Sequence, residues 1–107
     1  MIDIERLKPQ IIKRLKPLKP DKIILFGSFA CGEPTEDSDI DLFLLKDDLT
    51  LEKTREYEIM AHKSLKNLIK TYKIGFDILS APTKYIKERE DYFYKVDIME
   101  KGEVIYE

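Results

Sequence analysis

The sequence predicts a small α/β (α+β) protein, in which a mixed β-sheet has helices packed on one side. Residues 22–26 form a continuous apolar run of strand length, and residues 74–79 alternate apolar and other side chains as a strand does. Residues 50–72 carry apolar side chains at the three-to-four spacing of a helix. A chain of 107 residues is long enough for one hydrophobic core, so we expect residues 1–107 to form a single domain.

A short helix is predicted near the start of the chain, because apolar residues recur there every four positions: Leu7, Ile11 and Leu15. Proline fits best in the first turn of a helix, so Pro9 puts the expected start near Lys8. Pro17 and Pro20 then end this helix and open a rigid connection.

Two strands are predicted on either side of a loop. The apolar run at residues 22–26 ends abruptly at Gly27 and Ser28, and residues 31–38 are mostly small, acidic or Pro, which is typical of a loop. Residues 39–45 are predicted to form the second strand, which therefore begins with an Asp-Ile-Asp sequence.

The second half of the chain is predicted to alternate between helix and strand. The inward side of the helix at residues 50–72 is expected to consist of Tyr57, Met60, Ala61, Leu65, Leu68, Ile69 and Tyr72. A third strand follows at residues 74–79, and Ser80 and Pro82 mark the start of another helical stretch. Its inward residues are expected to be Phe93, Val96 and Met99. Gly102 is expected to end it before a last short strand at residues 104–106.

The composition excludes several classes of function. The net charge is −2, with 19 Lys and Arg against 21 Asp and Glu, so strong nucleic-acid binding through a basic surface is not expected. The single cysteine, Cys31, excludes an intramolecular disulfide and argues against a cysteine-based zinc site. The acidic first residues do not resemble a signal peptide, and no segment approaches the ~20 apolar residues of a membrane span. We expect a soluble cytoplasmic protein with no membrane contact.

The acidic pair at the start of the second strand is the first chemical signal. Asp39 and Asp41 are two residues apart on a strand, so their side chains leave the same face of the sheet. Two carboxylates ~5 Å apart repel by roughly 3 kcal/mol at an effective dielectric of about 20, whereas a bound Mg²⁺ converts that repulsion into coordination. The alternative is the solvated polar face of an edge strand. Against that alternative, the same face continues with Phe43 and Leu45.

The turn after the first strand is the second signal. Gly27 lets the backbone turn tightly, so main-chain N–H groups and the Ser28 hydroxyl can face an anion. A glycine turn alone is a weak signal, because glycine after a strand usually just makes a turn. The combination of a strand, Gly-Ser and then Asp-x-Asp on a second strand is more specific, since it offers phosphate-binding and metal-binding groups together.

These residues resemble a known family. Gly27-Ser28 followed by Asp39-Ile40-Asp41 is similar to the signature of the minimal nucleotidyltransferases of the DNA polymerase β-like superfamily, and the resemblance covers essentially the whole chain. It implies a polymerase β-like palm fold and a third carboxylate on the next central strand, which Asp77 matches. The alternation of the third strand had already put Asp77 on the face opposite its apolar residues.

The resemblance also implies a chemistry. Asp39, Asp41 and Asp77 are the expected catalytic and metal-binding residues, holding two Mg²⁺ ions, and Gly27 and Ser28 are the expected nucleotide-binding residues. ATP is the expected donor of AMP. The acceptor is expected to be a side-chain hydroxyl on a HEPN-type, all-helical toxin, which the transferred AMP would silence.

One departure and two alternatives accompany this interpretation. The family commonly has a basic residue where this chain has Cys31, so one contact to phosphate is expected to be missing. The chain could instead be an antitoxin that neutralises a HEPN partner by complex formation with little or no catalysis, or a free-standing nucleotidyltransferase for small molecules. Self-association is compatible with each of these interpretations.

His62 has no metal-type partner nearby in sequence and is expected to be an ordinary surface residue.

Overall fold

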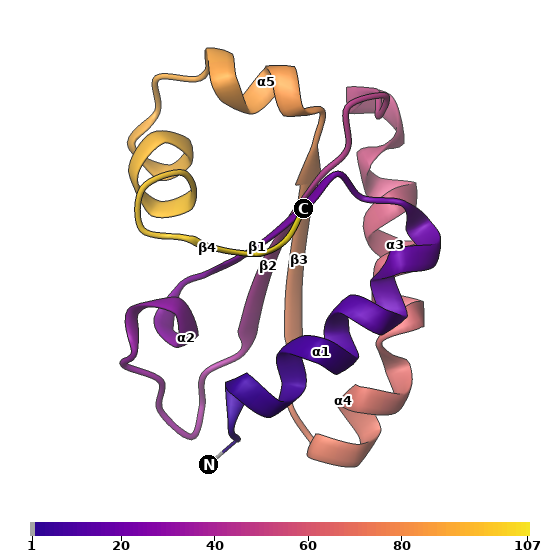
Figure 1. Ribbon diagram of the computed structural model, residues 1–107, viewed down its shortest axis with the longest axis vertical. Helices are drawn as coiled ribbons and strands as arrows, with labels where there is room; N and C mark the ends of the chain where they lie inside the picture. Colours follow the sequence, from indigo (N-terminus) through magenta and orange to yellow (C-terminus); the bar gives the residue numbers. More distant parts are fainter. Residues whose placement is uncertain (1) are drawn as a thin grey trace.

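The computed structural model describes residues 2–107 and contains a four-stranded mixed sheet (Figure 1). The strands are β1 (Lys22–Phe26), β2 (Ile40–Leu45), β3 (Phe76–Ala81) and β4 (Glu103–Tyr106). Their order across the sheet is β3-β2-β1-β4. Strand β1 is antiparallel to both of its neighbours, whereas β2 and β3 are parallel. The mixed sheet predicted from the sequence is therefore confirmed.

The longer helices cover one face of this sheet, as expected (Figure 1). They are α1 (Ile4–Leu15), α3 (Thr54–Ser64) and α4 (Lys66–Tyr72). The buried hydrophobic residues form two clusters, and the larger core lies between these helices and the sheet. The predicted apolar stripe of α1 is fully buried in it, with Leu7, Ile11 and Leu15 at most 1% exposed. Among the described residues, no helix has both the length and the apolar character needed to cross a membrane.

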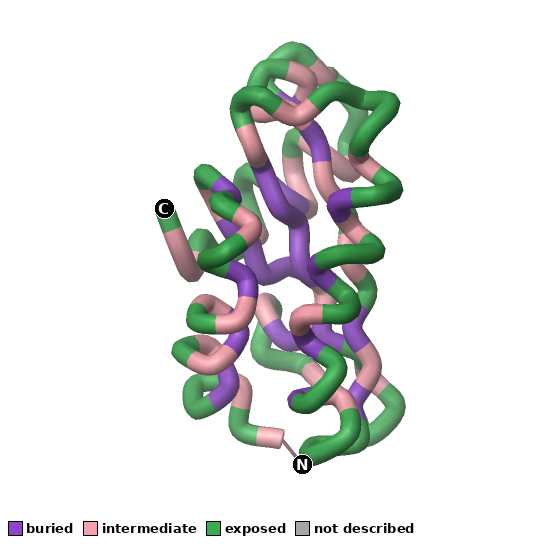
Figure 2. Tube along the Cα trace, turned by 90° about the vertical axis from the view of Figure 1, so that its right-hand side faces the viewer, coloured by how far each residue is buried: buried purple, intermediate pink, exposed green. Residues whose placement is uncertain are grey.

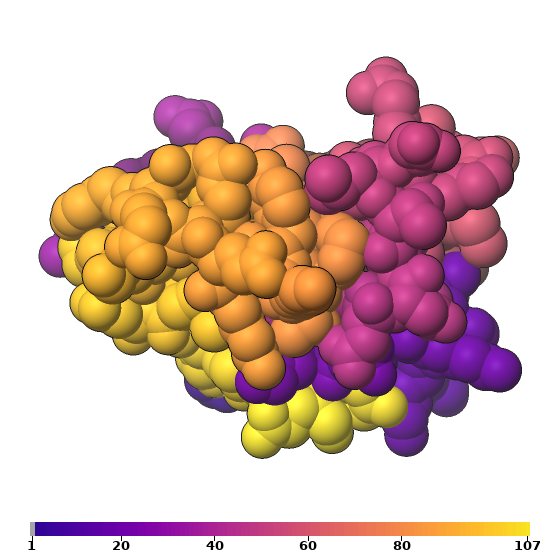
Figure 3. All heavy atoms as spheres, turned by 90° about the horizontal axis from the view of Figure 1, so that it is seen from above, coloured from indigo at the N-terminus to yellow at the C-terminus, as the bar shows by residue number. Residues whose placement is uncertain are grey.

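The opposite face is partly covered by shorter segments, which is a feature that the sequence did not predict. Helix α5 (Thr83–Glu88) and the π-helix η3 (Phe93–Ile98) lie on that side. Figure 3 shows this orange-to-yellow part of the chain on the side of the molecule away from the magenta residues near position 50. The strands between the two layers form the buried centre of the molecule (Figure 2).

Helix α1 begins four residues before the expected start at Lys8, because Asp3 caps it. The Asp3 carboxylate accepts a hydrogen bond from the Glu5 N–H at 3.1 Å, which stabilises an earlier first turn. Pro9 consequently lies inside the helix, where it has no N–H to donate to the Glu5 carbonyl. The connection after the helix is as expected, with Pro17 in a short 3₁₀ turn, η1 (Lys16–Leu18).

The predicted helix at residues 50–72 is divided into three pieces. A 3₁₀ turn, η2 (Leu51–Lys53), precedes α3, and the chain bends at Leu65 before α4 begins. The Ser64 hydroxyl donates to the Met60 carbonyl at 3.0 Å, a contact that often bends helices. The buried stripe is narrower than expected, with Tyr57, Ala61, Leu65 and Leu68 in it, so Met60 is 50% exposed and Tyr72 is 37% exposed.

Three further boundaries differ from the prediction. A short helix, α2 (Ser28–Cys31), follows β1 after Gly27, where only a turn was expected, and the third strand begins at Phe76 and extends to Ala81. In η3 the hydrogen bonds run over five residues, so the helix turns more slowly than an α-helix. Ile98 is therefore the buried residue, and Met99, expected to point inward, is 43% exposed.

Replacing Pro9 with Ala should stabilise the protein by about 1 kcal/mol, because the Glu5 carbonyl regains an intrahelical partner and the exposed proline ring packs against no core. The free energy of unfolding, measured by chemical denaturation, tests this. Pro17→Ala is the matched control, since Pro17 fits the start of its 3₁₀ turn and its loss should give no gain. Equal effects of the two replacements would contradict the explanation.

Candidate functional site

Strand register brings the acidic residues to one end of the sheet. Asp41 pairs with Phe26, the last residue of β1, and on its other side with Asp77 of β3. Asp39 lies one residue before β2, and Gly27 follows β1. Because β2 and β3 are parallel, both begin at this end, where the antiparallel β1 finishes. The side chain of Asp41 shares its face with Phe43, as the alternation predicted.

Two glycines give the carboxylates room beside the backbone. A Cβ atom on Gly27 would overlap a carboxylate oxygen of Asp41, and the φ of Gly27 is 76°, a conformation that side chains disfavour. A Cβ atom on Gly75 would lie 2.6 Å from Oδ1 of Asp39. Asp41 and Asp39 therefore each lie against main chain that carries no side chain. Gly27 was expected at the site from the sequence but Gly75 was not; the signal for Gly75 is its place just before Phe76 and Asp77.

The carboxylates repel one another. Burial, then the charge of Asp77 and a hydrogen bond with its side chain, then the charge of Asp39, raise the pKa of Asp41 to about 6. Within residues 2–107, no Lys, Arg or His forms an ion pair with any of the three. An acidic cluster with no counter-charge of its own is electrostatically suited to receive a cation.

The chemistry of this cluster fits a hard divalent ion. Carboxylate oxygens are the ligands that Mg²⁺ prefers, and the glycines leave the space that carboxylates need to approach one ion. Over the part of the chain that the structure describes, no three His, Cys, Asp or Glu side chains are already arranged around one point. The side chains of Asp39 and Asp77 are exposed and can turn, so the three acids offer ligands rather than a rigid cage.

The turn that carries Ser28 is closed by main-chain hydrogen bonds. The N–H groups of Ala30 and Cys31 both donate to the Gly27 carbonyl at 3.1 Å, and the Glu33 N–H donates to the Ser28 carbonyl at 3.0 Å. Ser28 is thereby held at the corner between β1 and α2, beside the Gly27 that adjoins Asp41. The predicted Gly-Ser turn and the acidic pair are therefore neighbours in space.

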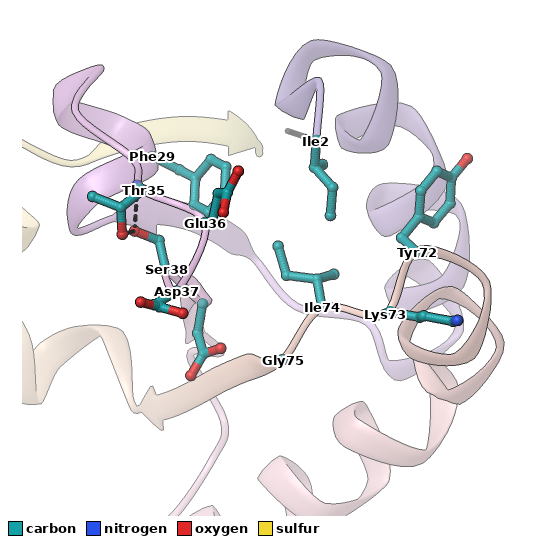
Figure 4. A pocket seen from close by; sticks show the side chains of 11 residues that line it. Ile2, Phe29, Thr35, Glu36, Asp37, Ser38, Tyr72, Lys73, Ile74 and Gly75 are labelled. Atoms are coloured by element: carbon teal, nitrogen blue, oxygen red, sulfur yellow. Dashed lines mark hydrogen bonds between the residues drawn. The ribbon is translucent and has the colours of Figure 1, made fainter.

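One pocket touches this site at one side only. Its volume is about 470 Å³, and the loop at residues 35–39 forms one wall (Figure 4). The opposite wall contains Tyr72, Lys73 and Ile74. Asp39 and Gly75 line the pocket, but Asp41 and Asp77 do not. It is therefore a space next to the acidic cluster rather than the cluster itself.

A second groove, of about 310 Å³, adjoins the site from the other side. It is lined by Phe26, Gly27, Cys31, Phe93, Asp97 and Lys101. The last three of these residues come from the C-terminal part of the chain, and no role was expected for Asp97 or Lys101 from the sequence. Phe93, expected on the inward side of the last helical stretch, is in contact with Phe26, with their ring centroids 5.8 Å apart.

His62 has a structural contact. Its Nε2 lies 3.1 Å from the Phe76 carbonyl, to which it donates, so the side chain ties α3 to β3. Among the described residues it does not join the acidic cluster.

Comparison with known proteins identifies relatives of the chain. A family model described as "Polymerase beta, Nucleotidyltransferase" matches residues 9–107. The candidate protein adenylyltransferase MJ0141 of Methanocaldococcus jannaschii is 38% identical over 103 residues, with 87% of this chain and 94% of that protein covered. The candidate protein adenylyltransferase MJ0604 of the same organism is 27% identical over 103 residues, covering 96% and 90%.

Solved structures share the fold. A toxin–antitoxin crystallised with AMP-PNP matches 92% of this chain and 72% of its own, with a TM-score of 0.61 and 22% identity. The toxin–antitoxin MntA-HpeT, crystallised as a double Asp-to-Glu mutant, matches 92% and 71%, with a TM-score of 0.59 and 19% identity. At this identity the likeness concerns the fold, and it confirms the polymerase β-like nucleotidyltransferase fold that the sequence predicted.

Replacing Gly75 with Ala should weaken metal binding without unfolding the protein. The new methyl group meets the flexible end of Asp39, so the carboxylate rotates away at little cost in stability, while Mn²⁺ affinity falls by about tenfold. Titration calorimetry with Mn²⁺ and thermal unfolding measure the two effects. Gly32→Ala is the control with the opposite pattern, because its φ of 74° makes Ala strained but nothing lies within 4 Å. Unchanged Mn²⁺ affinity in Gly75→Ala would contradict this role.

Replacing Asp41 with Asn should stabilise the metal-free protein above pH 6, by about 1–2 kcal/mol after allowance for solvent screening. The raised pKa means that the native state favours protonated Asp41. Wild type therefore carries a penalty from Asp41 above pH 6 that disappears as the pH falls toward 4, whereas the variant lacks this contribution, so its gain over wild type should shrink toward pH 4. Urea denaturation at pH 8 and pH 4 in EDTA checks this, with Asp47→Asn as control. A gain that persists at pH 4 would be inconsistent with repulsion as the cause.

Proposed function

We propose that this chain, which belongs to the polymerase beta nucleotidyltransferase family, transfers AMP from ATP to a hydroxyl group of a protein partner. Family membership makes the chain a nucleotidyltransferase. The observation that carries the finer proposal is the meeting of Asp39, Asp41 and Asp77 at one sheet end, beside the Gly27-Ser28 turn and without a basic partner.

In the proposed reaction the chain holds and orients its substrates. Asp39 and Asp41, with Asp77, would hold two Mg²⁺ ions, which neutralise charge on the triphosphate and on the transition state. The Ser28 hydroxyl and the Gly27 main chain steady the phosphates that depart. These groups align the α-phosphorus with the incoming hydroxyl, and most of the rate enhancement would come from this positioning and from charge stabilisation.

Asp77 is the proposed proton acceptor. The acceptor oxygen forms a bond to the α-phosphorus, the bond from that phosphorus to the bridging oxygen breaks, and pyrophosphate leaves with the electron pair. The proton of the hydroxyl passes to the Asp77 carboxylate. Asp77 is exposed at the edge strand β3, where an acceptor can reach it, whereas Asp41 is half-buried between β1 and β3.

ATP as the donor and a protein as the acceptor are supported by the relatives. Two of them carry the description of a protein adenylyltransferase, and a solved structure with this fold contains AMP-PNP, an analogue of ATP. We extend both properties to this chain. A location in the cytoplasm, where ATP and Mg²⁺ are abundant, and a single catalytic domain over residues 1–107 belong to the same proposal.

A toxin is the proposed partner, and a HEPN-type, all-helical protein is the class that we favour. The structural neighbours are toxin–antitoxin complexes, which supports a toxin as the molecule that accepts AMP. The open space beside Asp39 is suited to receive a protruding segment that carries the acceptor hydroxyl. AMP attached to such a hydroxyl would block the toxin by its bulk and charge.

Incubation with labelled ATP, Mg²⁺ and the HEPN protein encoded nearest to this chain's gene should label the HEPN protein. Asp41→Asn and Asp77→Asn should each lower the labelling rate by at least ~100-fold, because they remove a metal ligand and the proton acceptor. Asp47→Asn, a charge-matched change at the other end of β2, should leave the rate unchanged. Tight binding of the HEPN protein without any label would instead show an antitoxin that acts by complex formation.

A further inference from the structure

The groove of about 310 Å³ beside the Gly27-Ser28 turn is formed by two segments far apart in sequence. Gly27 and Cys31 contribute one wall, and Asp97 and Lys101 from the C-terminal part contribute the other. In Figure 1, α2 and the yellow segment that leads into β4 lie on the same side of the sheet. The volume is within the range of ~300–1,000 Å³ that is usual for small-ligand sites.

The main chain at Lys101 is firmly held. Its N–H donates to the Val96 carbonyl at 2.8 Å, as part of the π-helical hydrogen bonding that ends η3. The next residue, Gly102, packs directly on β1, since a Cβ atom there would lie 2.6 Å from Cγ2 of Ile24 and would overlap the Ile98 carbonyl. Glycine is therefore needed at position 102, and this close packing fixes where the Lys101 side chain starts.

The charge of Lys101 is available to a ligand. Among the described residues that line the groove, Lys101 is the one basic residue, and the opposite wall has Cys31 where a basic side chain could stand. In the described part of the chain Lys101 makes no ion pair, not even with Asp97, the acid of the same groove. The groove also adjoins Gly27, against which the Asp41 carboxylate lies.

We propose that Lys101 binds the β- and γ-phosphates of the donor nucleotide, a placement that rests on the proposed function. The α-phosphorus has to lie near the acidic cluster for transfer, so the rest of the triphosphate continues past Gly27 into a space that adjoins it. A polyphosphate next to three carboxylates needs positive charge beyond that of bound cations, and an ammonium group supplies it as a point charge with three donors. Lys101 thus stabilises the pyrophosphate that leaves.

Calorimetric titration with Mg²⁺ and inorganic tripolyphosphate, ATP or AMP tests this assignment. Lys101→Met should weaken tripolyphosphate and ATP binding by about tenfold, the loss expected for one exposed charge-assisted contact, and change AMP binding by less than about twofold. Lys95→Met, on the exposed surface of η3, removes the same charge outside the groove and should have no effect. Lys101→Arg should retain most of the affinity.

A sharper test moves the positively charged side chain from one wall of the groove to the other. In the Lys101→Met background, Cys31→Arg should restore tripolyphosphate and ATP affinity to within about threefold of wild type, because residue 31 lines the same space. Wild-type affinity in Lys101→Met, equal losses for ATP and AMP, or no binding of tripolyphosphate by wild type would each overturn the assignment. If Lys101 supports tripolyphosphate binding but no acceptor is ever labelled, the assignment stands and the proposed transfer to a protein fails.

Discussion

The register between β1, β2 and β3 is the constraint on which the candidate site depends. It places Asp41 opposite Asp77 on one side and opposite the end of β1 on the other. A slip of one residue in β2 would exchange its two faces and turn Asp41 toward the helix-covered core, where a carboxylate would be buried among apolar side chains. The apolar residues that fix the register, above all Leu42 and Leu44 in the larger core, thereby also fix the position of the acids.

The acidic cluster lowers the stability of the metal-free protein. Ionised Asp41 is disfavoured by burial and by two neighbouring carboxylates, and no basic side chain in residues 2–107 offsets that repulsion by an ion pair. The rest of the fold tolerates this cost because β1 and β2, which lead to the site, are almost completely buried. A cation that binds only the native state would relieve the repulsion between the carboxylates and raise the free energy of unfolding, so metal affinity and stability are linked.

The C-terminal segment has two roles in this arrangement. Its helices α5 and η3 cover the face of the sheet that the long helices leave open. Phe93 and Tyr94 pack there against Phe26 and Phe43. The same segment forms one wall of the groove beside Gly27. The layer formed by α5 and η3 therefore completes a core and also lies beside the candidate site. This explains why Lys101, which is far from the Gly27-Ser28 turn in sequence, is a candidate for substrate binding.

The sequence by itself determined the elements whose signals are local: the strand at residues 22–26, the buried stripe of the first helix, and the shared face of Asp41 and Phe43, all of which follow from periodicity. Capping and bending were missed, because Asp3 and Ser64 act through single hydrogen bonds that periodicity does not record. Only the tertiary structure decided that Gly75 leaves room for Asp39 and that Lys101 shares a groove with Cys31. These are contacts between segments distant in sequence, so they depend on strand pairing and packing, which no single segment encodes.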